Sequence, residues 1–168
     1  MDIHPGYVAG CIGRIVELHA RYYAAKAGFG LAFEAKVAAE LAGFCRAAQP
    51  DRDGLWLALD RDEVLGSIAI DGGHAAPGDA HLRWFILAEA AQGRGLGSRL
   101  LDGALEFCRS QGHRRVSLWT FEGLDAARHL YEKHGFRLVR SQLGSQWGTE
   151  VREQLFAWGL GLPEEEGA

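Results

Sequence analysis

The segment with the clearest chemical potential is a glycine-rich turn, Gln92-Gly93-Arg94-Gly95-Leu96-Gly97. It follows a nearly continuous apolar run and leads at once into a segment with helical spacing. Glycine permits a positive φ and lets a ligand approach the backbone closely. The first N–H groups of a helix have no partner within it and lie at the positive end of its dipole. The turn is therefore predicted to bind an anion, most commonly a phosphate or pyrophosphate.

Other interpretations of this turn can be compared on its residues. A P-loop requires Gly-Lys-Ser/Thr, whereas this chain has Gly97-Ser98-Arg99. A dinucleotide-binding fingerprint requires a glycine where Ser98 stands and an acidic residue about 20 positions further on, and Glu122 lies too far along. A turn that only tightens a strand–helix junction stays open as an alternative.

The elements that position this turn follow from the apolar periodicity. Helices are expected over 8–27, 33–45, 96–112 and 124–134, and strands over 54–60, 63–70, 80–88, 115–120, 136–142 and 150–160. Residues 3–6 are either a short edge strand or a frayed end, 71–80 form a loop, and 163–168 form a frayed tail. The run over 80–88 is typical of a strand covered on both faces. This order predicts an α/β fold in which helices flank a mixed β-sheet.

Composition is that of one globular domain spanning 1–168. A length of 168 residues, with 48% hydrophobic and 24% charged residues, is ordinary for a single soluble domain. The net charge of −4 argues against nucleic acid as a partner, because nucleic-acid-binding proteins usually carry a basic excess. The sequence has no apolar run of membrane-spanning length, its N-terminal residues lack a charged start followed by an apolar stretch, and its 3 cysteines form no CxxC pair. A cytoplasmic protein with reduced thiols and no membrane partner is expected.

Two motifs together resemble the GNAT superfamily of N-acetyltransferases. The pattern Q/R-x-x-G-x-G/A is matched by Gln92, Gly95 and Gly97, directly after a strand. The later pattern A-x-x-L-Y-x-x-x-G-F is matched by the segment Ala127–Phe136. The stretches HLRWFI, VSLWTFEGLDAARHLYEKHGFRLV, QWGTEVREQ and FGLAFEAKVA are further similar to the acetyltransferase half of bacterial MarR–GNAT fusion proteins.

This resemblance implies a GNAT-type acyl-CoA N-acyltransferase fold with acetyl-CoA as co-substrate. It implies that the backbone of Ile86 and Leu87, at the end of the central strand, pairs with the pantetheine arm. It also implies that N–H groups of the turn hold the pyrophosphate; the residues concerned are Gln92, Gly93, Arg94, Gly95, Leu96, Gly97 and Ser98. Arg94 and Arg99 either add positive charge there or are ordinary surface arginines.

Acetyl transfer to an amine needs a proton donor for the leaving thiolate and an acceptor for the amine's proton. The family pattern makes Tyr131 the expected general acid, with a core tyrosine as the alternative. A lysine-like amine has a pKa of about 10.4, so it enters protonated at neutral pH. His81 is the preferred general base, because it begins the strand where the superfamily often carries Glu or His and because imidazole titrates near neutral pH. A purely structural histidine is the alternative.

Two acidic residues compete with His81. Glu34 begins the second helix, in the region where relatives build the acceptor pocket. Glu122 follows the strand that is expected to splay from its neighbour and open the active cleft. Each is otherwise a solvated carboxylate, as is common in a first helical turn or a loop.

An aromatic set either lines an apolar acceptor pocket or packs in the core; it comprises Tyr22, Tyr23, Phe29, Phe33 and Trp119. No metal is expected, because His74 with Asp71 and Asp79 lacks a recognised ligand spacing.

The function predicted from the residues and the resemblance is direct transfer of an acetyl group from acetyl-CoA to a primary amine of a small molecule or peptide. The alternative is a non-catalytic acyl-CoA sensor, which binds the same molecule and releases no thiol. A homodimer formed through the exposed late strands is also considered.

Overall fold

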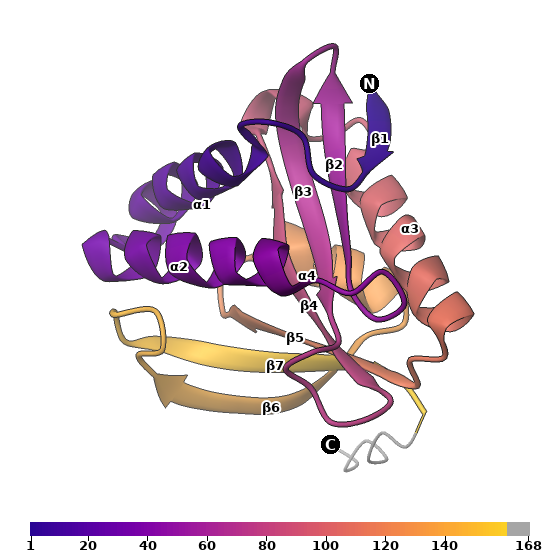
Figure 1. Ribbon diagram of the computed structural model, residues 1–168. Helices are drawn as coiled ribbons and strands as arrows, with labels where there is room; N and C mark the ends of the chain where they lie inside the picture. Colours follow the sequence, from indigo (N-terminus) through magenta and orange to yellow (C-terminus); the bar gives the residue numbers. More distant parts are fainter. Residues whose placement is uncertain (161–168) are drawn as a thin grey trace.

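The computed structural model describes residues 1–160, which form one seven-stranded sheet with helices on both faces (Figure 1). The strands are β1 (Asp2–Pro5), β2 (Gly54–Asp60), β3 (Glu63–Asp71), β4 (Asp79–Leu87), β5 (Arg115–Phe121), β6 (Arg137–Gly144) and β7 (Val151–Gly159). Their spatial order is β1-β2-β3-β4-β5-β7-β6. Only β4 and β5 pair in parallel. The predicted mixed sheet is confirmed and residues 3–6 belong to an edge strand, while the tail predicted over 163–168 lies outside the described residues.

Two helices cover each face of the sheet. They are α1 (Cys11–Ala27), α2 (Leu31–Ala47), α3 (Leu96–Gln111) and α4 (Asp125–Lys133), with a short 3₁₀ turn, η1, over Glu89–Ala91. One core joins α1 and α2 to the sheet through Ile15, Leu41 and Trp84. The other joins α3 and α4 to the opposite face, with Leu100, Leu105 and Tyr131 among its side chains. The helices expected from apolar spacing are therefore confirmed, with shifts of a few residues at their ends.

The parallel pair β4–β5 is very short. Only Asp79, Ala80 and His81 of β4 face partners on β5, which are Arg115–Ser117. Beyond this point the two strands diverge, so that β1–β4 and the group β5, β7 and β6 point in different directions (Figure 1). The β5-facing edge of β4 is left without a strand partner from Leu82 onward. The splay expected for β5 is confirmed, and it opens a cleft in the middle of the sheet.

A β-bulge interrupts β4 at Trp84. The register against β3 pairs Ala69 with Arg83 but Ser67 with Ile86, so β4 carries an extra residue. Trp84 has a φ of 47°, which is unusual for a bulky residue, and its carbonyl accepts a hydrogen bond from the Ser67 hydroxyl at 2.6 Å.

The bulge shifts which side chains face each helical layer. Before it, Ala80 and Leu82 pack with α3 and α4; after it, Phe85 and Leu87 do so instead. The sequence correctly predicts a strand covered on both faces, but its unbroken apolar run contains no sign of this change of phase.

No helix among residues 1–160 is long and apolar enough to cross a membrane. Within the same residues the three cysteines are unpaired thiols; Cys11 and Cys108 are buried and Cys45 is half-buried.

Candidate functional site

The cleft between β4 and β5 contains two pockets that meet at shared side chains. The first pocket has a volume of about 370 Å³ and the second about 420 Å³. Both are lined by Tyr23, Phe85, Thr120 and Tyr131. Two ligands in these pockets would therefore touch at these four residues, which suits a reaction between two bound molecules.

The second pocket is built around the glycine turn. It is lined by Ile86, Leu87, Gln92, Gly93, Gly95, Gly97 and Ser98, together with residues of α1 and α4. Gly95 is the N-cap of α3 and has a φ of 75°. The first hydrogen bond of the helix runs from the N–H of Arg99 to the carbonyl of Gly95, at 3.1 Å. The N–H groups of Leu96, Gly97 and Ser98 precede this bond and have no acceptor within the helix. They form a candidate anion site at the place that the sequence predicts.

The glycines of the turn serve two different purposes. Gly93 and Gly95 have positive φ values of 73° and 75°, and a Cβ at either would meet nothing within 4 Å. They shape the backbone and keep its surface open. At Gly97 a Cβ would lie 3.2 Å from Leu130 and 3.4 Å from Leu87. Gly97 thus allows α3 to pack closely on β4 and α4.

Three parts of the proposed phosphate site differ from expectation. The backbone N–H of Gln92 donates to the Glu89 carbonyl at 3.1 Å, so this amide is not available to a ligand, although its side chain lines the pocket. Arg94 contacts the sulfur of Met1 at 3.8 Å and Arg99 donates to the Met1 carbonyl at 3.3 Å. Neither arginine lines the pocket.

Other cationic side chains line this pocket instead. They are Lys26 from α1 and Lys133 from α4, with His129 beside them. The sequence analysis did not find them, because no motif connects a lysine in the first helix to a turn that follows the fourth strand. Leu124 contributes an apolar wall.

The residues present fit a CoA molecule. The free N–H groups of Leu96–Ser98 and the flanking lysines suit a pyrophosphate. The unpaired edge of β4, ending at Ile86 and Leu87, offers backbone groups to an extended amide-containing arm. The Leu87 carbonyl accepts a hydrogen bond from the Gln92 side-chain amide at 3.3 Å.

Tyr131 lies at the junction of the two pockets. Its ring is buried against Phe85, Phe136 and Phe156, with centroid distances of 6.1, 5.9 and 6.0 Å. Among the described residues its hydroxyl has no hydrogen-bond partner. Burial raises the pKa of Tyr131 well above its usual value, so the phenol keeps its proton throughout the physiological range. A buried, protonated hydroxyl without a partner is free to donate a hydrogen bond or its proton to an atom that enters the junction.

The first pocket has a largely aromatic wall. Tyr23, Phe29, Phe33 and Trp119 of the predicted aromatic set line it, while Tyr22 lines the second pocket. Additional rings come from Trp84, Phe85, Phe121 and Trp147. Phe29 stacks on Trp147 with a centroid distance of 6.1 Å and so connects the α1–α2 turn to the loop between β6 and β7.

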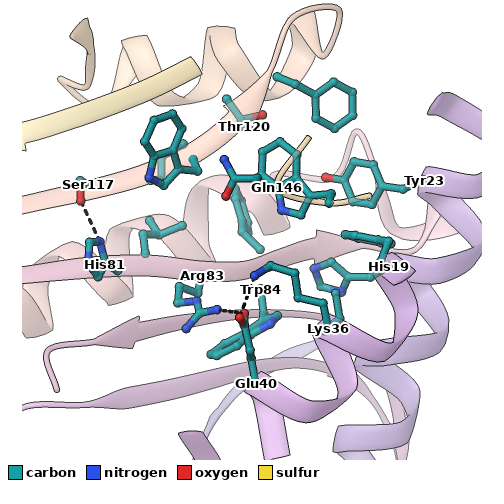
Figure 2. Close-up of a pocket in the computed structure, with 18 of the residues that line it drawn as sticks. His19, Tyr23, Lys36, Glu40, His81, Arg83, Trp84, Ser117, Thr120 and Gln146 are labelled. Atoms are coloured by element: carbon teal, nitrogen blue, oxygen red, sulfur yellow. Dashed lines mark hydrogen bonds and ion pairs between the residues drawn. The ribbon is translucent and has the colours of Figure 1, made fainter. Parts of the chain in front are cut away.

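His81 lines the first pocket, at the last residue pair that joins β4 to β5. Its Nδ1 hydrogen-bonds with the Ser117 hydroxyl at 2.9 Å (Figure 2). Four residues of β4, or roughly 13 Å of extended strand, separate it from Phe85 at the pocket junction. At this distance, proton transfer between His81 and a group at the pocket junction would need an intervening water.

Charged side chains form a linked group in the same pocket. Glu40 accepts hydrogen bonds from Lys36, at 2.8 Å, and from Arg83 (Figure 2). Arg83 also donates to Asp71 at 3.4 Å. Burial alone would raise the pKa of Glu40, but Lys36 and Arg83 outweigh it and hold that pKa below its usual value. Arg83 is visible in the sequence as a charge inside an apolar strand, but its partners on α2 are not.

His19 is a second histidine of the first pocket. It is buried on α1, and its Nδ1 lies 2.8 Å from the Ile15 carbonyl, which can only accept a hydrogen bond. Nδ1 must therefore carry the proton, and Nε2 has a free lone pair. Burial lowers the pKa of His19 to about 4, so the ring is neutral at neutral pH.

The acidic candidates lie away from both pockets. Glu34 is exposed in the first turn of α2, and Glu122 is exposed and pairs with Arg152 at 3.9 Å. Neither lines a pocket. His74 and Asp71 pair with each other at 3.0 Å, and residues 1–160 contain no group of three potential metal ligands.

The chain is similar in sequence to two mycothiol acetyltransferases. A 41% identical match over 88 residues relates the chain to a mycothiol acetyltransferase of Beutenbergia cavernae, and a 38% identical match over 99 residues to one of Geodermatophilus obscurus. These matches cover 51% and 54% of this chain but only 29% and 32% of the relatives, so the chain spans about a third of their length.

Solved structures share the fold. A ribosomal-protein-alanine N-acetyltransferase from Brucella melitensis aligns with a TM-score of 0.74 at 16% identity, and the alignment covers 95% of this chain and 100% of the Brucella chain. A putative acetyltransferase from Salmonella typhimurium, solved with its cofactor acetyl-CoA, aligns with a TM-score of 0.73 at 16% identity, covering 99% and 98%. The sequence model of the acetyltransferase (GNAT) family matches residues 15–136, which include the glycine turn, Tyr131 and the diverging strands. The chain therefore belongs to the acetyltransferase (GNAT) family.

Proposed function

We propose that the protein transfers an acetyl group from acetyl-CoA directly to a primary amine bound in the first pocket. The observation that carries this proposal is the meeting of the two pockets at Tyr131, between strands that have separated. The names of the mycothiol acetyltransferase relatives support acetyl transfer as the reaction.

In this mechanism the N–H groups of Leu96, Gly97 and Ser98 bind the pyrophosphate, and Lys26 and Lys133 balance its charge. The unpaired edge of β4 orients the pantetheine arm, so that the thioester lies beside Tyr131. Acetyl-CoA, when bound, supplies the acetyl group as this activated thioester.

The amine enters the first pocket as an ammonium group and gives one proton to His81 through water. Its nitrogen then attacks the carbonyl carbon. As the C–N bond forms and the C–S bond breaks, Tyr131 gives its proton to the sulfur. The second proton, which leaves the new amide nitrogen, restores the phenol, and His81 releases the first proton to solvent, so all protons are accounted for.

A thiol-release assay with a panel of amines tests this proposal. Tyr131→Phe should lower kcat by about 100-fold or more, because general acid catalysis contributes about that much, while CoA affinity changes little. Tyr7→Phe is a matched control, since Tyr7 is 63% exposed and outside both pockets.

If Tyr131→Phe turned over as fast as the wild type, Tyr131 would have no chemical role. If calorimetry found CoA binding and no amine released thiol, the chain would instead be an acyl-CoA sensor. That alternative is relevant because stretches such as HLRWFI and QWGTEVREQ resemble the acetyltransferase half of MarR–GNAT fusion proteins.

We also propose that two copies form a homodimer along β6. This strand is at the edge of the sheet, and its side chains include Leu138 and Leu143, which are 39% and 61% exposed. An exposed edge with apolar side chains is a surface that a second strand can pair with.

A further inference from the structure

We infer that the amine acceptor also carries a carboxylate, which Lys36 and Arg83 bind at the α2 side of the first pocket. The inference rests on the proposed function, because it names the class of molecule that occupies the acceptor pocket. It is drawn from the way hydrogen-bond donors and acceptors are used in the charged group formed by Lys36, Glu40, Asp71 and Arg83.

The carboxylate oxygens of this group are already engaged. Glu40 receives Lys36 Nζ on Oε1, at 2.8 Å, and Arg83 Nη2 on Oε2 (Figure 2). Asp71 has a side chain only 2% exposed and receives Arg83 Nη1 on Oδ2 at 3.4 Å. Its Oδ1 accepts the backbone N–H groups of Gly73 at 3.0 Å and His74 at 3.3 Å. A carboxylate has about four acceptor sites; those of Asp71 are filled, while about two on Glu40 stay open to an incoming ammonium group.

The donors of the group are only partly used. A lysine ammonium has three N–H donors and an arginine guanidinium five. The interactions above use one donor of Lys36 and two of Arg83, and both side chains line the pocket. Their side chains are 37% and 29% exposed, so the remaining donors are accessible from the cleft. The remaining donors outnumber the remaining acceptor sites, so the group binds an incoming acceptor such as a carboxylate more readily than an incoming donor.

The guanidinium is also held in a fixed orientation. It lies over the indole of Trp84, with 4.1 Å between Arg83 Cζ and the ring centroid. The bulge at Trp84 sets the position of this ring beside the arginine that precedes it. A planar guanidinium fixed by stacking and by two carboxylates presents a ready binding edge to a planar anion such as a carboxylate.

The charge balance favours a monoanion. The two permanent cations, Lys36 and Arg83, are matched by two anions, Glu40 and Asp71, and Asp71 also pairs with the His74 ring at 3.0 Å. A carboxylate adds one negative charge, partly compensated by the amine of the same molecule. A dianionic phosphate would add two negative charges next to two existing carboxylates, which is less favourable.

Aromatic rings form another part of the wall. Phe29 packs on Phe33 and Phe121, with centroid distances of 5.0 and 5.3 Å, and Tyr23 packs on Phe33 at 5.3 Å. The class of acceptor that fits donors on one wall and rings on another is an apolar amino acid.

Matched pairs of amines that differ only in the carboxylate test this inference. The pairs are phenylalanine with phenethylamine, and leucine with 3-methylbutylamine. The wild type should use the amino acid of each pair with a kcat/KM about 10- to 100-fold higher, the worth of a charge-assisted hydrogen bond. Lys36→Met should bring the two values of each pair close together, and Lys36→Arg should restore most of the difference. Arg46→Met, an exposed cation near the end of the same helix, should preserve the wild-type ratio.

A binding measurement separates this inference from the proposed function. Calorimetry compares N-acetylphenylalanine with N-acetylphenethylamine on the CoA-bound wild type and on Lys36→Met. Preferential binding of the acid that is lost in Lys36→Met supports the carboxylate site even if no amine releases thiol, in which case only the proposed reaction fails. Equal binding, no binding of either compound, or equal kcat/KM within each pair overturns the carboxylate site.

Discussion

Burial has opposite chemical consequences for two residues that share the first pocket. For Tyr131 it favours the protonated phenol and preserves a proton donor; for His19 it favours the neutral imidazole and preserves a proton-free Nε2. His19 is consequently a poor base at neutral pH but a good hydrogen-bond acceptor for a ligand. His81, which is only half-buried, is the histidine we assign to proton uptake.

His19 should make the free energy of unfolding depend on pH. Its pKa is 6.5 when unfolded and about 4 when folded, so between these values the unfolded chain binds more protons. The folded state should therefore lose about 2 kcal/mol from this group between pH 7.5 and pH 5. Urea unfolding at both pH values measures this loss of unfolding free energy. His19→Gln, which keeps a donor for the Ile15 carbonyl, should lose less unfolding free energy between the two pH values than the wild type. His129→Gln, at an exposed histidine, is the control; a loss in His19→Gln as large as that of the wild type would contradict the assignment.

At this scale the sequence predicts single residues well when a motif contains them. Tyr131 and the glycine turn are of this kind. The sequence does not predict that Lys36 and Arg83 meet at Glu40, because Glu40 and Arg83 lie 43 positions apart in the chain. Neither Lys36 nor Glu40, the two residues on α2, belongs to a motif. A lysine and a glutamate four apart on a helix are, from sequence, an ordinary surface pair.

At the scale of elements, periodicity and glycine positions predict most helices and strands. The bulge in β4 is the exception. Its position depends on how β3 pairs with β4, and Trp84 at a φ of 47° contradicts the local preference of a bulky residue. Local sequence contains no information about that pairing, so neither the bulge nor the way it orients Arg83 and Trp84 is predictable from it.

The contact between α3 and its neighbours can be tested with two glycines of that helix. A Cβ at Gly103 meets nothing within 4 Å, so Gly103→Ala should raise the free energy of unfolding by about 0.5–1 kcal/mol through helix propensity. A Cβ at Gly97 presses on Leu130 and Leu87, so Gly97→Ala should lack this gain and should weaken CoA binding by displacing the first turn of α3. Urea unfolding and calorimetry measure both. Equal stabilisation by the two variants, with unchanged CoA affinity, would show that Gly97 does not control the packing.

At the scale of the whole molecule, the sheet has two open edges of different character. β1 is a four-residue strand, whereas β6 is eight residues long and mostly exposed. Short edge strands limit association and long ones permit it. This contrast is the reason that we assign the dimer contact to β6.

The dimer is tested by light scattering coupled to size-exclusion chromatography. The wild type should elute with the mass of two chains and Leu143→Glu with the mass of one. Leu31→Glu, at a leucine 82% exposed in α2, should remain a dimer. A monomeric wild type, or a dimeric Leu143→Glu, would exclude β6 as the interface.

The brief pairing of β4 with β5 has a mechanical consequence for the enzyme. Backbone bonding at three residue pairs contributes little to holding the two parts of the sheet together, so their separation is governed by apolar side chains such as Val116, which is buried with the side chains of α3 and lines neither pocket. Exchanging such a side chain for a smaller one would alter the width of the gap in which both ligands react. Turnover can thus be tuned from positions that no ligand ever touches.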